Sequence, residues 1–79
     1  MLEELQTTDK IVGLKQSVRM LQSGMAKKAF IAKDAAPNVT DTIVALCNEK
    51  KVPVKWVKSM SELGKASGIE VGAAVTVVY

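Results

Sequence analysis

The chain has 79 residues, 48% of them hydrophobic and 24% charged, with a formal net charge of +3; these proportions indicate one globular domain over residues 1–79 rather than a disordered segment. No apolar run reaches the roughly 20 residues that span a bilayer, and the first ten residues are acidic rather than a basic secretory leader, so we expect a cytoplasmic protein with no membrane partner. Because the chain has no histidine and a single cysteine, Cys47, an internal disulfide and a metal cluster of soft ligands are excluded.

The first third of the chain predicts a short helix, a short strand and a longer helix. Residues 2–7 favour a helix, and residues 11–12 are an apolar pair that suits a short strand. A second helix is expected from residue 14 to Gly24, because glycine readily adopts the left-handed conformation that ends a helix. Its inward stripe is predicted from four apolar residues at helical spacing: Leu14, Val18, Leu21 and Met25.

A buried strand and another helix follow. The apolar run "AFIA", residues 29–32, is bounded by charged residues and predicts a strand. Pro37 suits the first turn of the next helix, which Asn38 or Thr40 would cap. This helix should end near Lys50, ahead of a proline that favours extended geometry. Its inward stripe is predicted to be Val39, Ile43, Leu46 and Cys47.

The remaining residues predict a strand, a helix and a last strand. The run "VKWV", residues 54–57, suits a strand, and Ser59 with Glu62 three residues later forms a capping box at the start of a helix. Gly68 would close that helix, and "AAVTVVY" at the end is rich in β-branched residues. The alternation of helices and strands predicts an α/β fold in which helices cover both faces of a small sheet.

The sequence offers little for catalysis. General acid–base chemistry near neutral pH usually relies on histidine or on a buried pair of carboxylates, but here the carboxylates are scattered and only Asp34 directly follows a predicted strand. Cys47 falls on the apolar stripe of its helix and is interpreted as a core thiol. The segment "GIEVG" lacks the spacing of a glycine-rich phosphate loop. We therefore expect no enzymatic activity, no catalytic residue, no metal and no cofactor.

The start of the longer N-terminal helix is the first candidate binding segment. Gly13 permits close approach of a partner, and the free N–H groups of a helix start attract phosphate. Lys15 and Arg19 are four residues apart and share a helix face, while the Gln16 amide can both donate and accept hydrogen bonds. A pI near 9.2 agrees with an anionic partner. The alternative is an ordinary solvated helix face.

The loop "GIEVGAA" before the last strand is the second candidate. Ile69 and Val71 are apolar and stand between glycines, and an exposed apolar loop can stack against unpaired bases. The alternative is that these two residues merely lead into the last strand.

Taken together, these segments resemble a known family. The order "VG-x-x-x-x-x-R", "G-M-A-K-x-A-F-I-A-x-D", "P", "LC-x-E-K-x-VP-V-x-W-V" and "ELGKASG" is similar to the kink-turn RNA-binding ribosomal protein family, the L7Ae and L30e type, and in particular to its short bacterial members. The resemblance runs from about Leu5 to Tyr79. It implies a three-layer α-β-α sandwich around a four-stranded mixed sheet, in agreement with the alternation of elements.

The resemblance also implies a function and a set of contacts. A kink-turn is an RNA helix that an internal loop bends sharply beside tandem sheared G·A pairs. Family members dock the helix start after the glycine into the widened groove at these pairs, cover the unpaired nucleotides with the loop before the last strand, and approach a flipped-out nucleotide with a third segment. The RNA-binding residues are therefore expected to be Gly13, Leu14, Lys15, Gln16, Arg19, Lys28, Lys33, Ala36, Pro37, Thr40, Ile69, Glu70 and Val71.

The chain departs from the family pattern in ways that bear on affinity. Lys15 and Gln16 stand where the family commonly has Asn-Glu, Met60 replaces a lysine and Val71 replaces an arginine. Each lost cation should flatten the salt dependence and weaken binding, with Lys15, Lys28 and Lys33 as partial electrostatic replacements. We expect a monomer that binds and stabilises bent ribosomal or regulatory RNA, with the ribosome as a further candidate partner. The alternative is a ribosome-associated or protein-interaction module of the same fold that has lost specific RNA binding.

Overall fold

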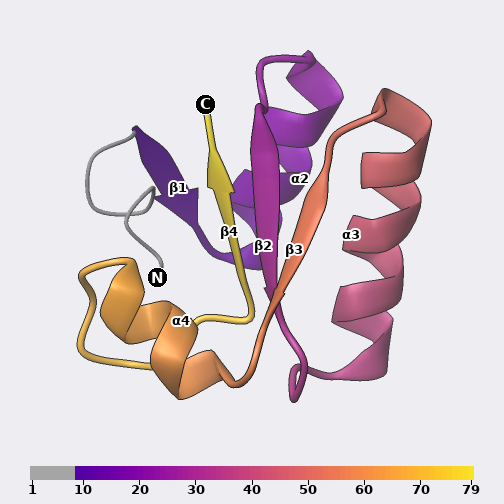
Figure 1. Cartoon of the computed structure of the whole chain (residues 1–79). Helices are drawn as coiled ribbons and strands as arrows, with labels where there is room; N and C mark the ends of the chain where they lie inside the picture. The colour runs from indigo at the N-terminus through magenta and orange to yellow at the C-terminus, as the bar shows by residue number, and fades with distance from the viewer. Residues whose placement is uncertain (1–8) are drawn as a thin grey trace.

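A computed structural model describes residues 9–79, so the helix predicted over residues 2–7 lies outside the described part of the chain. Every other predicted helix and strand is present (Figure 1). No helix within residues 9–79 is long and apolar enough to cross a membrane. In chain order the elements are β1 (Lys10–Val12), α2 (Leu14–Ser23), β2 (Lys28–Ala32), α3 (Pro37–Lys50), β3 (Val54–Val57), α4 (Met60–Ala66) and β4 (Val75–Val78).

The four strands form one mixed sheet in the order β1-β4-β2-β3. The last strand, β4, lies between β1 and β2 and is antiparallel to both, with Val12 opposite Thr76 and Ile31 opposite Val75. The edge strand β3 is parallel to β2, with Ala32 opposite Val57. Consequently β1, β2 and β3 all run in one direction, and β4 alone runs in the other.

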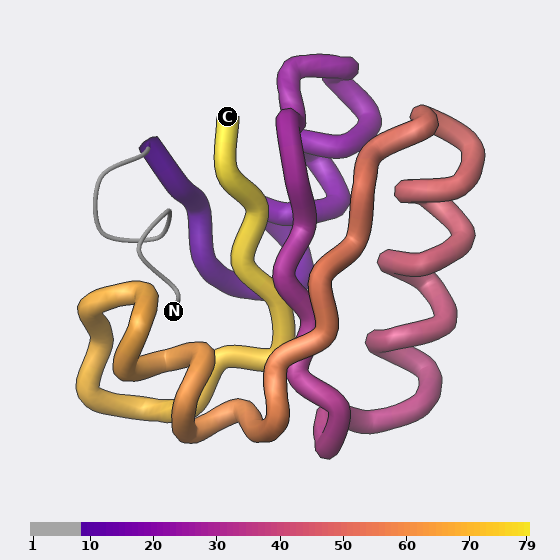
Figure 2. Tube along the Cα trace, viewed as in Figure 1, coloured from indigo at the N-terminus to yellow at the C-terminus, as the bar shows by residue number. Residues whose placement is uncertain are grey.

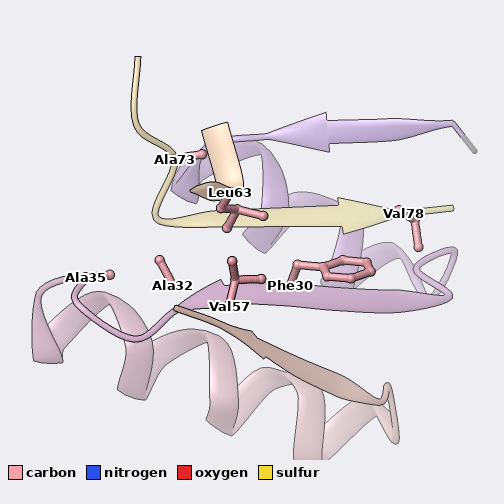
Figure 3. Close-up of a cluster of buried hydrophobic side chains, with 7 residues drawn as sticks. All are labelled: Phe30, Ala32, Ala35, Val57, Leu63, Ala73 and Val78. Carbon is pink, nitrogen blue, oxygen red and sulfur yellow. The ribbon is translucent and has the colours of Figure 1, made fainter. Parts of the chain in front are cut away.

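Two apolar cores lie on the two faces of the sheet. Alternate residues of β2 divide between them: Ala29 and Ile31 pack with α2 and α3, whereas Phe30 and Ala32 pack toward α4 (Figure 3). Figure 2 shows the resulting layers, with α2 and α3 behind and beside the sheet and α4 on the opposite face. The three-layer α-β-α sandwich with a four-stranded mixed sheet is therefore confirmed.

The observed helix ends agree with those predicted from the sequence, with one exception. Gly24, after α2, has φ 79° as predicted, and Gly68 adopts φ 83° two residues after α4 ends. The prediction that Asn38 or Thr40 caps α3 is wrong. Both residues lie inside α3, whose N-cap is Ala36 without a side-chain hydrogen bond, because Pro37, with its fixed φ and missing N–H, already starts the helix.

The predicted stripe of α2 is correct only in its middle. Leu21 is fully buried and Val18 packs against the same core, but Leu14 is 37% exposed and Met25 is 64% exposed. The helix ends at Ser23, so Met25 lies beyond it, and Leu14 is its first residue. The other buried residue of α2 is Ser17, which lies one turn before Leu21 on the same face of the helix.

The buried thiol of Cys47 gives a test of this core. Cys47 is fully buried, and desolvation raises its pKa. Since a raised pKa lowers the thiolate fraction at any given pH, and the thiolate is the nucleophile, we expect slow reaction with a chromogenic disulfide reagent at pH 8 in buffer and fast reaction in urea. Equal rates in the two conditions would contradict the burial of this thiol.

Candidate nucleic-acid interface

The candidate binding segments that the sequence indicates lie together at one end of the sheet. Because β1, β2 and β3 run in one direction, each finishes at the same end and passes directly into α2, α3 or α4, while β4 starts there (Figure 1). We call this the loop end; it consists of the start of α2, the β2–α3 loop (residues 33–36), the start of α4 and the loop before β4 (residues 68–74). In open α/β sheets, ligands commonly bind at the carboxyl ends of the strands.

Backbone hydrogen bonds hold these segments together. The Gly13 N–H donates to Val75 O at 3.1 Å, which fixes the start of α2 against the start of β4. On the other side of β4, the Ala32 N–H donates to Ala74 O at 2.9 Å. The start of α2 and the loop before β4 therefore lie at the same end of the molecule and are joined through the sheet.

A second set of contacts ties the β2–α3 loop to α4. The Lys33 N–H donates to Val57 O at 2.8 Å, and the Met60 N–H donates to the Asp34 carboxylate oxygen Oδ1, also at 2.8 Å. The Ala73 N–H in turn donates to Met60 O at 3.0 Å. The loop end is thus one connected surface rather than a set of independent loops.

Gly13 shapes the start of α2. Its φ of 110° lies in the region that side-chain-bearing residues rarely adopt. A Cβ at this position would lie 3.3 Å from the Gln16 side-chain oxygen Oε1, so the amide folds back over the glycine. The glycine therefore lets both the turn and the amide stay close to the backbone.

The start of α2 presents cations beside this amide. Lys15 and Arg19 are exposed, as is Gln16, and the two cations are four residues apart on one helix face. A groove continues from this face along the side of the helix. Its lining residues are Ile11, Gln16, Arg19, Met20, Ser23 and Met25.

The helices α2, α3 and α4 all start at the loop end, and they differ in how their first N–H groups are used. In α4 side chains accept two N–H groups of the first turn: Asp34 accepts the Met60 N–H, and Ser59 Oγ accepts the Glu62 N–H at 3.2 Å. The second of these bonds is one half of the predicted capping box. By contrast α2 and α3 have neither a side-chain cap nor an acidic residue in the first turn. At α3, however, Pro37 has no N–H and the Val39 N–H donates to Ala36 O at 3.0 Å, so Asn38 supplies the open N–H there. The positive ends of two helix dipoles therefore point toward solvent, where they can attract anions.

The loop before β4 is held against α4 by close glycine contacts. A Cβ on Gly64 would clash with the Val71 carbonyl oxygen, and one on Gly72 would lie 3.2 Å from the Met60 side chain. The Ile69 N–H donates to Gly64 O at 3.0 Å. Within the loop the side chains divide: Val71 is 71% exposed, whereas Ile69 is partly buried against the core below α4.

The structure brings most, but not all, of the predicted contact residues together. Lys33, Ala36 and Pro37 are exposed at the loop end, and Thr40 lies one turn into α3 with its hydroxyl donating to Pro37 O. Lys28 does not join them, because it starts β2 and pairs with Val78 at the opposite end of the sheet. Its ammonium lies 5.6 Å from the centre of the Phe30 ring.

Three residues that organise the loop end were not predicted. The sequence marks Asp34 only as a carboxylate after a strand, although it caps α4. Gly64 and Gly72 act through the space that they leave for Val71 and Met60. A glycine in the middle of a short helical segment is the signal that could have pointed to close packing. Within residues 9–79, histidine, cysteine and carboxylate side chains form no group that could hold a metal ion.

Comparison with known proteins places the chain in a family. The model of the ribosomal protein L7Ae/L30e/S12e/Gadd45 family matches residues 1–79, and the chain therefore belongs to this family. An RNA-binding protein from Halalkalibacterium halodurans is 44% identical over 69 residues, covering 87% of this chain and 84% of the relative. The RNA-binding protein YbxF from Geobacillus stearothermophilus is 40% identical over 74 residues, covering 94% of this chain and 90% of the relative.

A solved structure supports the fold independently. A protein of unknown function from Bacillus halodurans superposes with a TM-score of 0.85, covering 96% of this chain and 76% of the other, at 24% sequence identity. This similarity establishes the architecture and agrees with the described sheet and helix layers.

The Gly64 contact predicts how the loop before β4 is held in place. In Gly64→Ala the new methyl group meets the Val71 carbonyl oxygen, so we expect the loop to shift and the free energy of unfolding to fall by about 1–3 kcal/mol, although alanine is the better helix former. Urea unfolding measures the loss, and faster amide exchange at Ile69 reports the shift. The control is Lys65→Ala, which removes only an exposed side chain; a stabilised Gly64→Ala protein with unchanged exchange would contradict the contact.

Proposed function

We propose that the protein binds kink-turn RNA at the loop end and stabilises its bent conformation. The observation that carries this proposal is the junction of the α2 start with the loop before β4 through the Gly13–Val75 and Ala32–Ala74 hydrogen bonds. Two relatives that are at least 40% identical are named RNA-binding proteins, which supports RNA as the partner. A cytoplasmic monomer acting on ribosomal or regulatory RNA, without catalysis, is part of the same proposal.

The start of α2 would recognise the sheared G·A pairs. Its open N–H groups and the ammonium of Lys15 suit backbone phosphates, and Arg19 reaches the same strand from one turn further along the helix. Gln16 is the residue able to read a base edge, because an amide both donates and accepts hydrogen bonds. The amide that is held over Gly13 is therefore the main source of sequence discrimination.

The loop before β4 would cover the unpaired nucleotides of the kink-turn. Val71 offers an exposed apolar surface for a base, with Glu70 beside it, while the buried part of Ile69 anchors the loop to the core. Neither Met60 nor Val71 carries a cation, so this side of the site contributes shape rather than charge. Lys33 is exposed in the β2–α3 loop, four residues before Pro37, and would supply charge at the start of α3.

The mechanism is selection of a preformed RNA shape. The contacts that join the loop end run through sheet and helix backbone, so the protein surface changes little between its free and bound states. A kink-turn RNA exchanges between extended and bent forms, and a rigid surface that fits only the bent form shifts this equilibrium by its difference in affinity. Lys28, at the opposite end of the sheet, would act on RNA only through the long-range field of the protein.

The direct test compares a standard kink-turn RNA with a variant in which the G·A pairs are replaced by Watson–Crick pairs. We expect the kink-turn to bind at least tenfold more tightly, because the variant lacks both the bend and the widened groove. Gel-shift titration measures the affinities, and fluorescence energy transfer between dyes on the two stems measures the bend. Equal, weak binding to both RNAs would contradict the proposal and favour the alternative of a protein-interaction module.

Arg19→Ala tests the phosphate contact on α2. We expect weaker kink-turn binding and a slope of log affinity against log salt that is smaller by about one unit, since one phosphate contact is lost. The matched control is Lys27→Ala, which removes one positive charge from an exposed position at the opposite end of the sheet, where the Lys27 N–H donates to Val78 O. An equal effect of both substitutions would mean that net charge, rather than the face of α2, controls binding.

A further inference from the structure

A tryptophan at the edge of the sheet takes no part in the contacts proposed above. Trp56 is the only tryptophan of the chain, and its side chain is 45% exposed on β3. Large aromatic side chains usually gain stability by burial. The exposed part of the indole is free to contact a partner.

The position of Trp56 makes it a neighbour of the loop end. It pairs with Ile31 in the parallel register, one residue before β2 ends, and the following Val57 accepts the Lys33 N–H at 2.8 Å. Since β3 is an edge strand, nothing pairs with its outer side within the described sheet. The surface of the loop end thus continues past the β2–α3 loop onto the edge of β3.

The charges around Trp56 select an anionic partner. From Lys55 to the first turn of α4, residues 55–61 contain Lys55 and Lys58 but no aspartate or glutamate. Lys58, two residues after Trp56, is exposed, as is Lys33 just beyond the paired strand β2. Lys55 is also exposed, but as the neighbour of Trp56 in β3 it points to the other face of the sheet. Lysines on an edge strand also oppose pairing with a strand from another protein. An exposed aromatic ring among cations suits an unpaired base with its phosphates.

We propose that Trp56 stacks on an unpaired base of the bound RNA that lies outside the kink-turn, with Lys33 and Lys58 near the adjoining phosphates. The inference rests on the proposed function, because the RNA strand would reach β3 from the loop end. It extends the site from the bend itself to single-stranded RNA that flanks a stem, so that targets with such a flank bind more tightly than isolated kink-turns.

The experiment combines protein variants with RNA extensions. One RNA is a blunt-ended kink-turn, and the others carry a short unpaired extension at each strand end in turn. We expect at least one extension to tighten binding of the unchanged protein by about fivefold or more, the effect of one base–aromatic stack. The gain should shrink in Trp56→Phe, which keeps a smaller ring, and vanish in Trp56→Ala. The same extension should quench tryptophan emission, which reports Trp56 alone.

The outcomes separate this inference from the proposed function. If an extension tightened binding of Trp56→Ala as much as that of the unchanged protein, or if no extension tightened binding or quenched the emission, the role of Trp56 would be overturned while kink-turn binding stood. If the blunt kink-turn bound no better than its G·A-substituted form, the proposed function would fail first. Because the emission is measured on the unchanged protein, the test does not depend on how well Trp56→Ala folds.

Discussion

The antiparallel pairing of β4 with both β1 and β2 is the constraint on which the rest of the structure depends. It forces β1 and β2 to run in a common direction, and β3 shares that direction through its parallel pairing with β2. As a result α2, α3 and α4 all begin at one end of the sheet. The Gly13–Val75 and Ala32–Ala74 hydrogen bonds then fix two of the connections to the start of β4. A chain of 79 residues thereby brings segments from both of its ends to one rigid surface.

The presence or absence of side-chain caps at the three helix starts determines the charge preference of this surface. Asp34 and Ser59 satisfy the first turn of α4, so that helix serves as a support for the loop before β4. The starts of α2 and α3 carry no such caps and no acidic residue, and they face solvent with Lys15, Arg19 and Lys33 nearby. The same backbone geometry therefore yields one structural helix start and two that favour anions.

Much of the fold could be predicted because its signals are local. The apolar run before Lys33, the glycine after α2 and the Ser59–Glu62 spacing each determine an element through neighbouring residues, and the structure agrees. The order of the strands depends on pairing between distant segments, and no local pattern predicts it. The resemblance to a family implies only that the sheet is mixed and has four strands. The same limit explains the misplaced Lys28, since its remoteness from the α2 start depends on the direction of β2. The supporting role of Gly64 depends on a contact with Val71 that only the folded chain creates.

The central claim is that the loop end, and no other surface, receives the bend of the RNA. Backbone amide chemical shifts measured by NMR before and after addition of a kink-turn RNA test it most directly. The account predicts the largest changes at residues 13–19, 33–37 and 69–72, with little change at the opposite end of the sheet, around Lys28 and Lys50. Changes concentrated at that opposite end, with the α2 start unaffected, would contradict it.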